Sequence, residues 1–181
     1  MVRALVGGVM LVVASCGNAQ PTKPGASATG DPTQSAARAG LAEIRIFFDA
    51  GQRAAITIHE DGMVEFDDGS RPLRVTADGK VLTNPGTKWS QTGDQLVASI
   101  EADGSVVPDL FGATIHADGT ASFRGDSTLD LKGKTVSLDA FARGGHVDGA
   151  SSPGLRRTAM LVLLAFDSLL LGAASGAAAG P

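Results

Sequence analysis

The sequence contains one cysteine, one tryptophan and no tyrosine among its 181 residues. A single cysteine excludes an intramolecular disulfide and any zinc site made of several cysteines. A chain without disulfides depends on its core, its partners or an anchor for stability. With so few aromatic residues and 24 glycines, the sequence predicts a turn-rich fold around a core of small aliphatic side chains.

Concentrated charge and the common catalytic motifs are also absent. The formal net charge is −4 and the basic residues do not cluster, so we expect no nucleic-acid partner. The sequence has no P-loop, Gly-x-Ser-x-Gly or His-Glu-x-x-His motif, and Asp67-Asp68-Gly69 falls short of an EF-hand loop. We therefore predict no catalytic residue, no cofactor and no metal site, although a dispersed serine or carboxylate site stays open.

The N-terminus has the order of an export signal. A basic start at Arg3 precedes an apolar segment, Ala4 to Val13, that is too short to span a bilayer. Val13-Ala14-Ser15-Cys16 follows directly and resembles the lipobox of bacterial lipoproteins. The resemblance implies cleavage before Cys16 and lipidation of that cysteine, which would anchor the chain stably in a membrane. The alternative is an ordinary secretory signal with an incidental cysteine.

The same resemblance predicts location in a bacterial cell envelope. Gly17 stands where this family commonly has the aspartate that retains a lipoprotein in the inner membrane, which favours the outer membrane, facing the periplasm or the surface. Residues 1–15 are the predicted signal peptide. The Ala-, Gly-, Ser- and Pro-rich residues 16–40 predict a lipid anchor and a disordered linker, with a random-coil span of about 25 Å.

A degenerate repeat begins after residue 41. Asp-Gly pairs at 61–62, 78–79, 103–104 and 118–119 lie between short runs of alternating apolar residues, which is a strong hairpin signal. Two-residue loops would pair apolar with polar side chains. Three-residue loops with a left-handed glycine instead pair the apolar residues on one face. They predict the pairs Ile56–Phe66, Ile58–Val64, Val75–Val81, Ile100–Val106 and Ile115–Ala121.

The predicted fold is mainly β, an antiparallel meander of short hairpins that forms a sandwich, barrel or roll over residues 41–142. We expect strands near 43–48, 53–59, 63–66, 72–76, 80–83, 95–101, 105–107, 111–117, 120–124, 127–131 and 134–139. A two-residue Lys132-Gly133 turn is expected to pair Leu129 with Val136. Trp89 is expected to cover one end of the core. The predicted core is Ile44, Ile46, Ile56, Ile58, Val64, Phe66, Leu73, Val75, Val81, Leu96, Ala98, Ile100, Val106, Ile115, Phe123, Leu129, Leu131, Val136 and Leu138.

The C-terminal region predicts one apolar helix. Residues 143–151 are interpreted as a linker, 152–172 as the helix and 173–181 as a flexible tail. Ser152 is a suitable cap and Pro153 suits a first turn. The short apolar run and the central Asp167 oppose a membrane span, and the arginines at 156 and 157 would lie outside, against the positive-inside tendency. We expect a helix that packs on the sheet or lies at a membrane surface.

Three histidines complete the candidates. His59 and His116 occupy matching positions two residues before Asp-Gly, on the face opposite the core, where repeat similarity explains them better than a metal site. His146 is expected in an exposed linker.

The whole layout is similar to uncharacterised repeat lipoproteins of myxobacteria-like Gram-negative bacteria, a likeness that supplies no activity. We predict a non-catalytic, membrane-anchored envelope lipoprotein whose β domain scaffolds or binds an envelope protein or polysaccharide. The alternative is a lipid-anchored envelope hydrolase with a dispersed site.

Overall fold

The computed structural model describes residues 39–48, 53–84, 94–125 and 130–177. Within these ranges the helices are α2 (Leu138–Phe141) and α3 (Pro153–Ala177). The strands are β1 (Ile44–Phe47), β2 (Ile56–Ile58), β3 (Met63–Phe66), β4 (Leu73–Val75), β5 (Lys80–Thr83), β6 (Leu96–Ile100), β7 (Val106–Val107), β8 (Thr114–Ile115), β9 (Ala121–Ser122), β10 (Thr135–Val136) and β11 (His146–Asp148).

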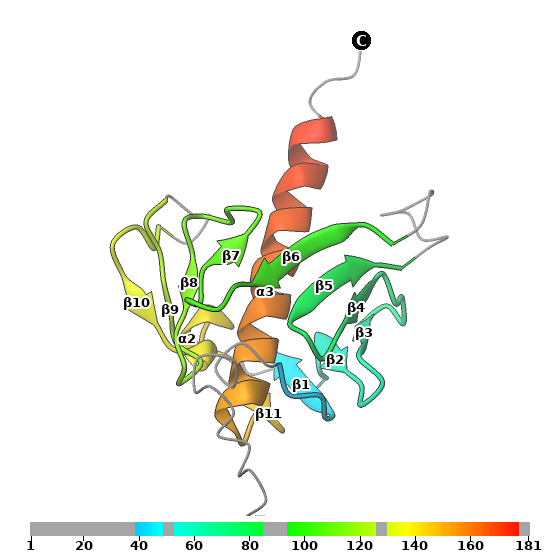
Figure 1. Ribbon diagram of the computed structural model, residues 1–181. Coiled ribbons are helices and arrows are strands. Elements are labelled where there is room, and N and C mark those ends of the chain that lie inside the picture. Colours follow the sequence, from blue (N-terminus) through cyan, green and yellow to red (C-terminus); the bar gives the residue numbers. More distant parts are fainter. Residues whose placement is uncertain (1–38, 49–52, 85–93, 126–129, 178–181) are drawn as a thin grey trace, which may run out of the picture.

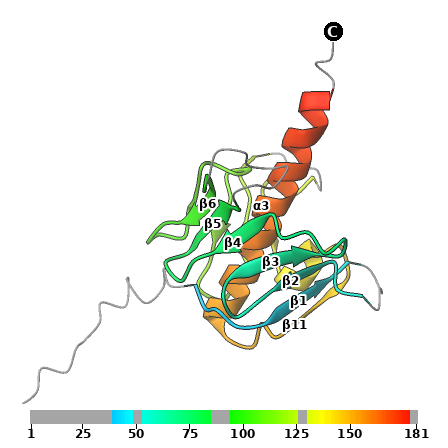
Figure 2. The ribbon, with the colours of Figure 1, turned by 90° about the vertical axis from the view of Figure 1, so that its right-hand side faces the viewer.

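The strands form two antiparallel sheets around the C-terminal helix (Figure 1). The larger sheet has the order β11-β1-β2-β3-β4-β5-β6-β7, and the smaller has the order β10-β9-β8. An isolated bridge between Ser105 and Thr114 brings them together. The fold is therefore mainly β, a meander with one C-terminal apolar helix, as predicted. Among the described strands the arrangement is a roll around α3, without closure into a barrel (Figure 2).

The Asp-Gly hairpins adopt the predicted register. Ile58 pairs with Val64, Val75 with Val81, Ile100 with Val106 and Ile115 with Ala121. The glycines that close these loops, Gly62, Gly79, Gly104 and Gly119, have φ between +81° and +87°. The three-residue loop with a left-handed glycine is thus confirmed at all four positions.

Each of the first three loop glycines also pairs with the following strands. The Val75 amide donates to the Gly62 carbonyl at 2.7 Å, Ile100 to Gly79 at 3.0 Å, and Ile115 to Gly104 at 2.7 Å. Successive turns are therefore joined along one side of the meander. Gly119 differs, because a side chain there would meet Arg156 of α3.

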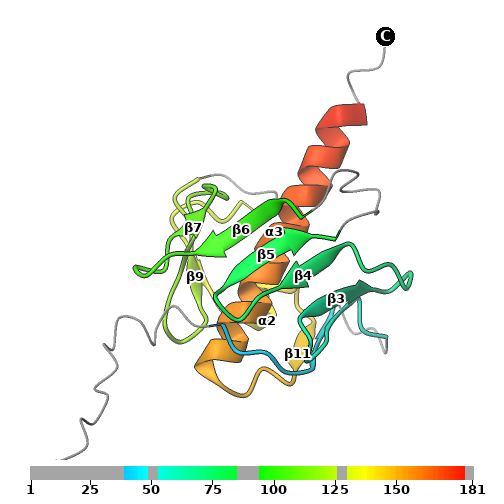
Figure 3. The same cartoon turned by 45° about the vertical axis from the view of Figure 1, so that its right-hand side comes forward.

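Helix α3 fills the centre of the roll. The segment from Ala159 to Ala165 is buried on every side and joins one hydrophobic core with inward-facing residues of both sheets (Figure 3). The Leu155 amide hydrogen-bonds to Ser152 Oγ at 3.3 Å, which confirms the predicted start of the helix. No helix among the described residues is long and apolar enough to cross a bilayer.

Most of the predicted core is buried, but Leu96 is not: 48% of it is exposed. Val81 pairs with Ala98 while Leu82 pairs with Leu96, so β6 carries one extra residue at this point. Such a bulge reverses the alternation that the sequence implied. Val97 packs against the core instead, and Phe66, Leu131 and Val136 are only partly buried.

The region after residue 130 departs further from the prediction. Lys132-Gly133 does form a turn, in which the Lys134 amide donates to the Leu131 carbonyl, and Val136 pairs with Ala121 of β9. The expected strand 134–139 ends early because Ser137 caps helix α2, its hydroxyl accepting from Ala140. The expected linker 143–151 contains strand β11, which pairs with β1. Cys16, Trp89 and Leu129 lie outside the described residues.

Candidate interaction surface

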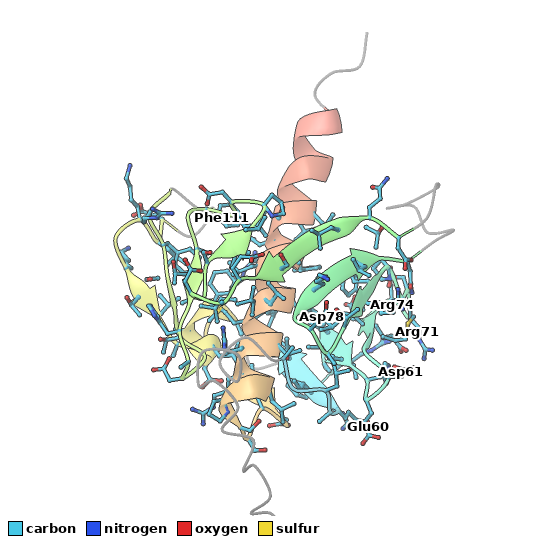
Figure 4. All side chains as sticks on the ribbon, viewed as in Figure 1. Glu60, Asp61, Arg71, Arg74, Asp78 and Phe111 are labelled. Atoms are coloured by element: carbon cyan, nitrogen blue, oxygen red, sulfur yellow. The ribbon has the colours of Figure 1, made fainter. Side chains whose placement is uncertain are left out.

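A row of partly exposed side chains crosses the solvent-facing side of the larger sheet. Met63 pairs with Arg74, Arg74 with Leu82, and Leu82 with Leu96. Directly paired residues point to the same face of a sheet, and the flanking Leu73 and Val75 are buried. We call Met63, Arg74, Leu82 and Leu96 the outer-face row. Arg74 lies on the side of the sheet away from α3 (Figure 4).

The bulge in β6 creates the apolar end of this row. With regular alternation, Leu96 would lie in the core. The extra residue turns it outward beside Leu82. Arg74 makes an ion pair with Asp94, just before β6, and this pair crosses from β4 to the start of β6. The solvent-facing side of the sheet therefore carries an apolar strip that contains one ion-paired arginine, Arg74.

A charged cluster borders the row on β2 and β3. The Glu65 carboxylate accepts from Arg71 Nε at 2.7 Å and lies 3.3 Å from His59 Nε2. The hydrogen bond from Arg71 lowers the pKa of Glu65, as does the weaker contact with His59. Both neighbours therefore favour the ionised form of Glu65.

The histidines do not converge. His59 contacts Glu65, whereas His116 Nε2 lies 3.0 Å from Ser122 Oγ on the smaller sheet. His146 lies on β11 and stacks on Phe47 with ring centroids 4.2 Å apart, so it belongs to a strand and not to the expected linker. Across the described ranges, no three His, Cys, Asp or Glu side chains gather closely enough to hold a metal ion.

The loop aspartates serve the turns. Asp61, Asp68, Asp103 and Asp118 each accept a hydrogen bond from the amide two residues later, at 2.8–3.0 Å. The hydrogen bonds from Ser105 and Thr120 lower the pKa of Asp103 and Asp118, respectively. Turn chemistry therefore accounts for these carboxylates.

One cavity of about 200 Å³ lies between the smaller sheet, α2 and the start of α3. Its lining includes Asp118, Asp139 and Arg156. Asp118 is engaged by both the amide and the hydroxyl of Thr120, and Arg156 Nε donates to the Ala150 carbonyl. Asp118 and Arg156 are therefore both engaged by groups in neighbouring loops.

Two charged side chains are buried on α3. Asp167 is 5% exposed and accepts from Arg143 at 3.5 Å, which explains how a helix with a central carboxylate packs in the core. Arg157 is 3% exposed, its Nε has no hydrogen-bond partner, and burial lowers its pKa. In the sequence, Arg157 is only a charged residue at the start of the apolar helix, and no pattern predicts that it is buried.

The chain matches no protein-family model, and comparisons with curated proteins and with solved structures find none that is similar to it. The assignment of function therefore depends on the residues themselves.

Proposed function

We propose that this chain is a non-catalytic lipoprotein of a bacterial cell envelope, most consistent with the outer membrane, whose β domain is a binding or scaffolding module. The anchoring part depends on Val13-Ala14-Ser15-Cys16 at the end of a short apolar segment. Lipid on Cys16 would hold the domain at a membrane, and the following linker would set its distance from the surface.

The binding part depends on one observation, the outer-face row. Partly exposed Met63 and Leu82 lie on either side of Arg74, whose guanidinium is paired with Asp94, and exposed Leu96 lies at the end of the row. Methionine and arginine are enriched at protein–protein interfaces, and arginine is enriched among the residues that carry most of the binding energy. This composition favours an envelope protein over a polysaccharide as the partner.

Lipidation is tested by replacing Cys16 with Ala and labelling cells with a palmitate analogue. The parent is expected to carry the label and to partition with membranes, whereas Cys16→Ala should lose the label and accumulate as an uncleaved precursor. Equal labelling and processing of both chains would refute the lipoprotein assignment.

The binding surface is tested with the lipidated protein as bait in envelope fractions, comparing the parent with Leu96→Asp. Val107→Asp is the matched control, because Val107 is similarly exposed (43%) but lies on β7, outside the outer-face row. Loss of this apolar contact should lower partner retention by about tenfold. If Leu96→Asp and the control retain the same proteins equally, the outer-face row is not the binding surface.

A further inference from the structure

The last turns of α3 extend beyond both sheets, as three views show (Figures 1, 2 and 3). Burial along the helix changes at the same place. Leu161 and Leu164 are fully buried, whereas Leu170 is 41% exposed. We call Ser168–Ala177 the projecting end of α3; at its base Leu169 is partly buried against the core, and Leu170 is the first exposed residue.

The sequence of the projecting end is apolar and uncharged. Leu169, Leu170 and Leu171 are followed only by Gly, Ala and Ser up to Ala177, and no charged side chain occurs between Ser168 and Pro181. A soluble protein rarely exposes contiguous apolar surface without a use for it. Ten helical residues measure about 15 Å, roughly half the hydrocarbon thickness of a bilayer. The projecting end has the length to enter one leaflet.

We propose that the projecting end inserts into the bilayer that holds lipidated Cys16, so that the domain is attached at two points. This inference rests on the lipoprotein function proposed above. The occupant is a lipid surface and not a second protein, because the anchor would keep a bilayer at high local concentration beside this helix end.

The length of the linker fits such an arrangement. The described chain begins beside the start of α3, where Thr158 Oγ1 donates to the Gly40 carbonyl at 2.8 Å. From Thr158 to Ala177 the helix measures about 29 Å. The composition of residues 17–38 predicts a coil whose span is about 25 Å. One membrane is therefore within reach of both attachment points.

The charges near the exit point indicate how the contact is made. Phe166, Phe48 and Phe66 pack together there, beside Asp67 and Asp68. Arg143 lies over the Phe48 ring. Because Arg143 is already paired with Asp167, and Asp67 and Asp68 lie beside the same phenylalanines, attraction of Arg143 to anionic lipid would contribute little. Insertion should proceed through apolar contact alone, on neutral as well as anionic bilayers.

The test places a photoreactive benzophenone amino acid in the full lipidated chain, at position 170 or, as matched control, at position 96. Each protein is reconstituted into phosphatidylcholine vesicles and into vesicles that also contain phosphatidylglycerol. Illumination should give at least about tenfold more lipid adduct at 170 than at 96, a ratio equivalent to about 1.4 kcal/mol. The excess should be the same in both vesicles, and Leu171→Asp should reduce it. Thermal melts verify that each variant is folded.

The outcomes separate this inference from the function on which it rests. Palmitate-analogue labelling of the same preparations reports lipidation of Cys16. A lipidated chain with equal, low adduct at both positions overturns the inference and leaves the lipoprotein function standing. Protein adducts at 170 in place of lipid adducts also overturn it, since they identify a protein at the helix end. An unlabelled chain refutes both.

Discussion

The glycine that closes the first repeated hairpin is predicted to be indispensable, whereas a nearby glycine in the same type of turn is not. Gly62 and Gly69 both follow aspartate, and both have positive φ, +84° and +77°. A Cβ at Gly62 would lie 2.1 Å from the Val75 carbonyl oxygen, while a Cβ at Gly69 meets nothing within 4 Å. Replacing each with alanine therefore separates backbone strain from steric overlap.

The magnitudes follow from these distances. Alanine in the left-handed region costs roughly 1–2 kcal/mol, and a less flexible unfolded chain returns roughly 0.4–1 kcal/mol. Gly69→Ala should destabilise by about 1 kcal/mol. Gly62→Ala carries the same cost and must also push β4 away, which strains the Val75–Gly62 hydrogen bond. Overlap of this kind adds about 1–3 kcal/mol.

Thermal and urea unfolding of the two variants measure the difference. For a difference of about 2 kcal/mol, Gly62→Ala should melt about 4–8 °C below Gly69→Ala. Equal melting temperatures would refute the close packing of successive turns, because left-handed strain alone would then explain both variants.

Two further predictions concern charge. Arg157→Met removes a buried guanidinium with an unsatisfied Nε and should raise the free energy of unfolding by about 1–2 kcal/mol, measured by thermal unfolding. The control, Arg156→Met, changes an exposed arginine and should give no gain. A lower melting temperature for Arg157→Met would mean that the guanidinium has a favourable partner. The folded-state pKa values of Asp103 and Asp118 lie below that of an ordinary aspartate, so their contribution is present above the unfolded pKa and is lost as pH falls through the folded one. The melting temperature should therefore drop between about pH 5 and pH 3. The Asp103→Asn, Asp118→Asn double variant keeps the hydrogen-bond acceptors but cannot titrate, so its melting temperature should drop less. An identical drop in the parent and the double variant would show that these two aspartates do not cause it.

The parts of the fold that the sequence predicted are those that depend on local chemistry. Asp-Gly pairs determine loop length, and loop length together with a one-sided core determines register. The pairing of Ile58 with Val64 could therefore be predicted from the sequence. The bulge beside Leu96 was not, because nothing in the alternation of β6 distinguishes a regular strand from one with an extra residue. Pairings between distant segments, such as β11 with β1 and β10 with β9, depend on closure of the whole roll.

The candidate surface likewise combines features that depend on local sequence with features that depend on the pairing of distant strands. The sequence predicted turn roles for the loop aspartates, whose hydrogen-bond partners lie two residues along the chain. The outer-face row joins residues from four strands, and it includes a leucine that the pattern assigned to the core. A surface of this kind becomes visible only after the bulge is known.

The central place of α3 has a consequence for synthesis. The helix is the last described element of the chain, yet the inner faces of both sheets pack against it. A nascent chain that ends before Pro153 contains all the described strands but lacks the helix that packs with Ile44, Ile56 and Ile115 in the core. The domain therefore completes its folding only after its C-terminal region has been synthesised.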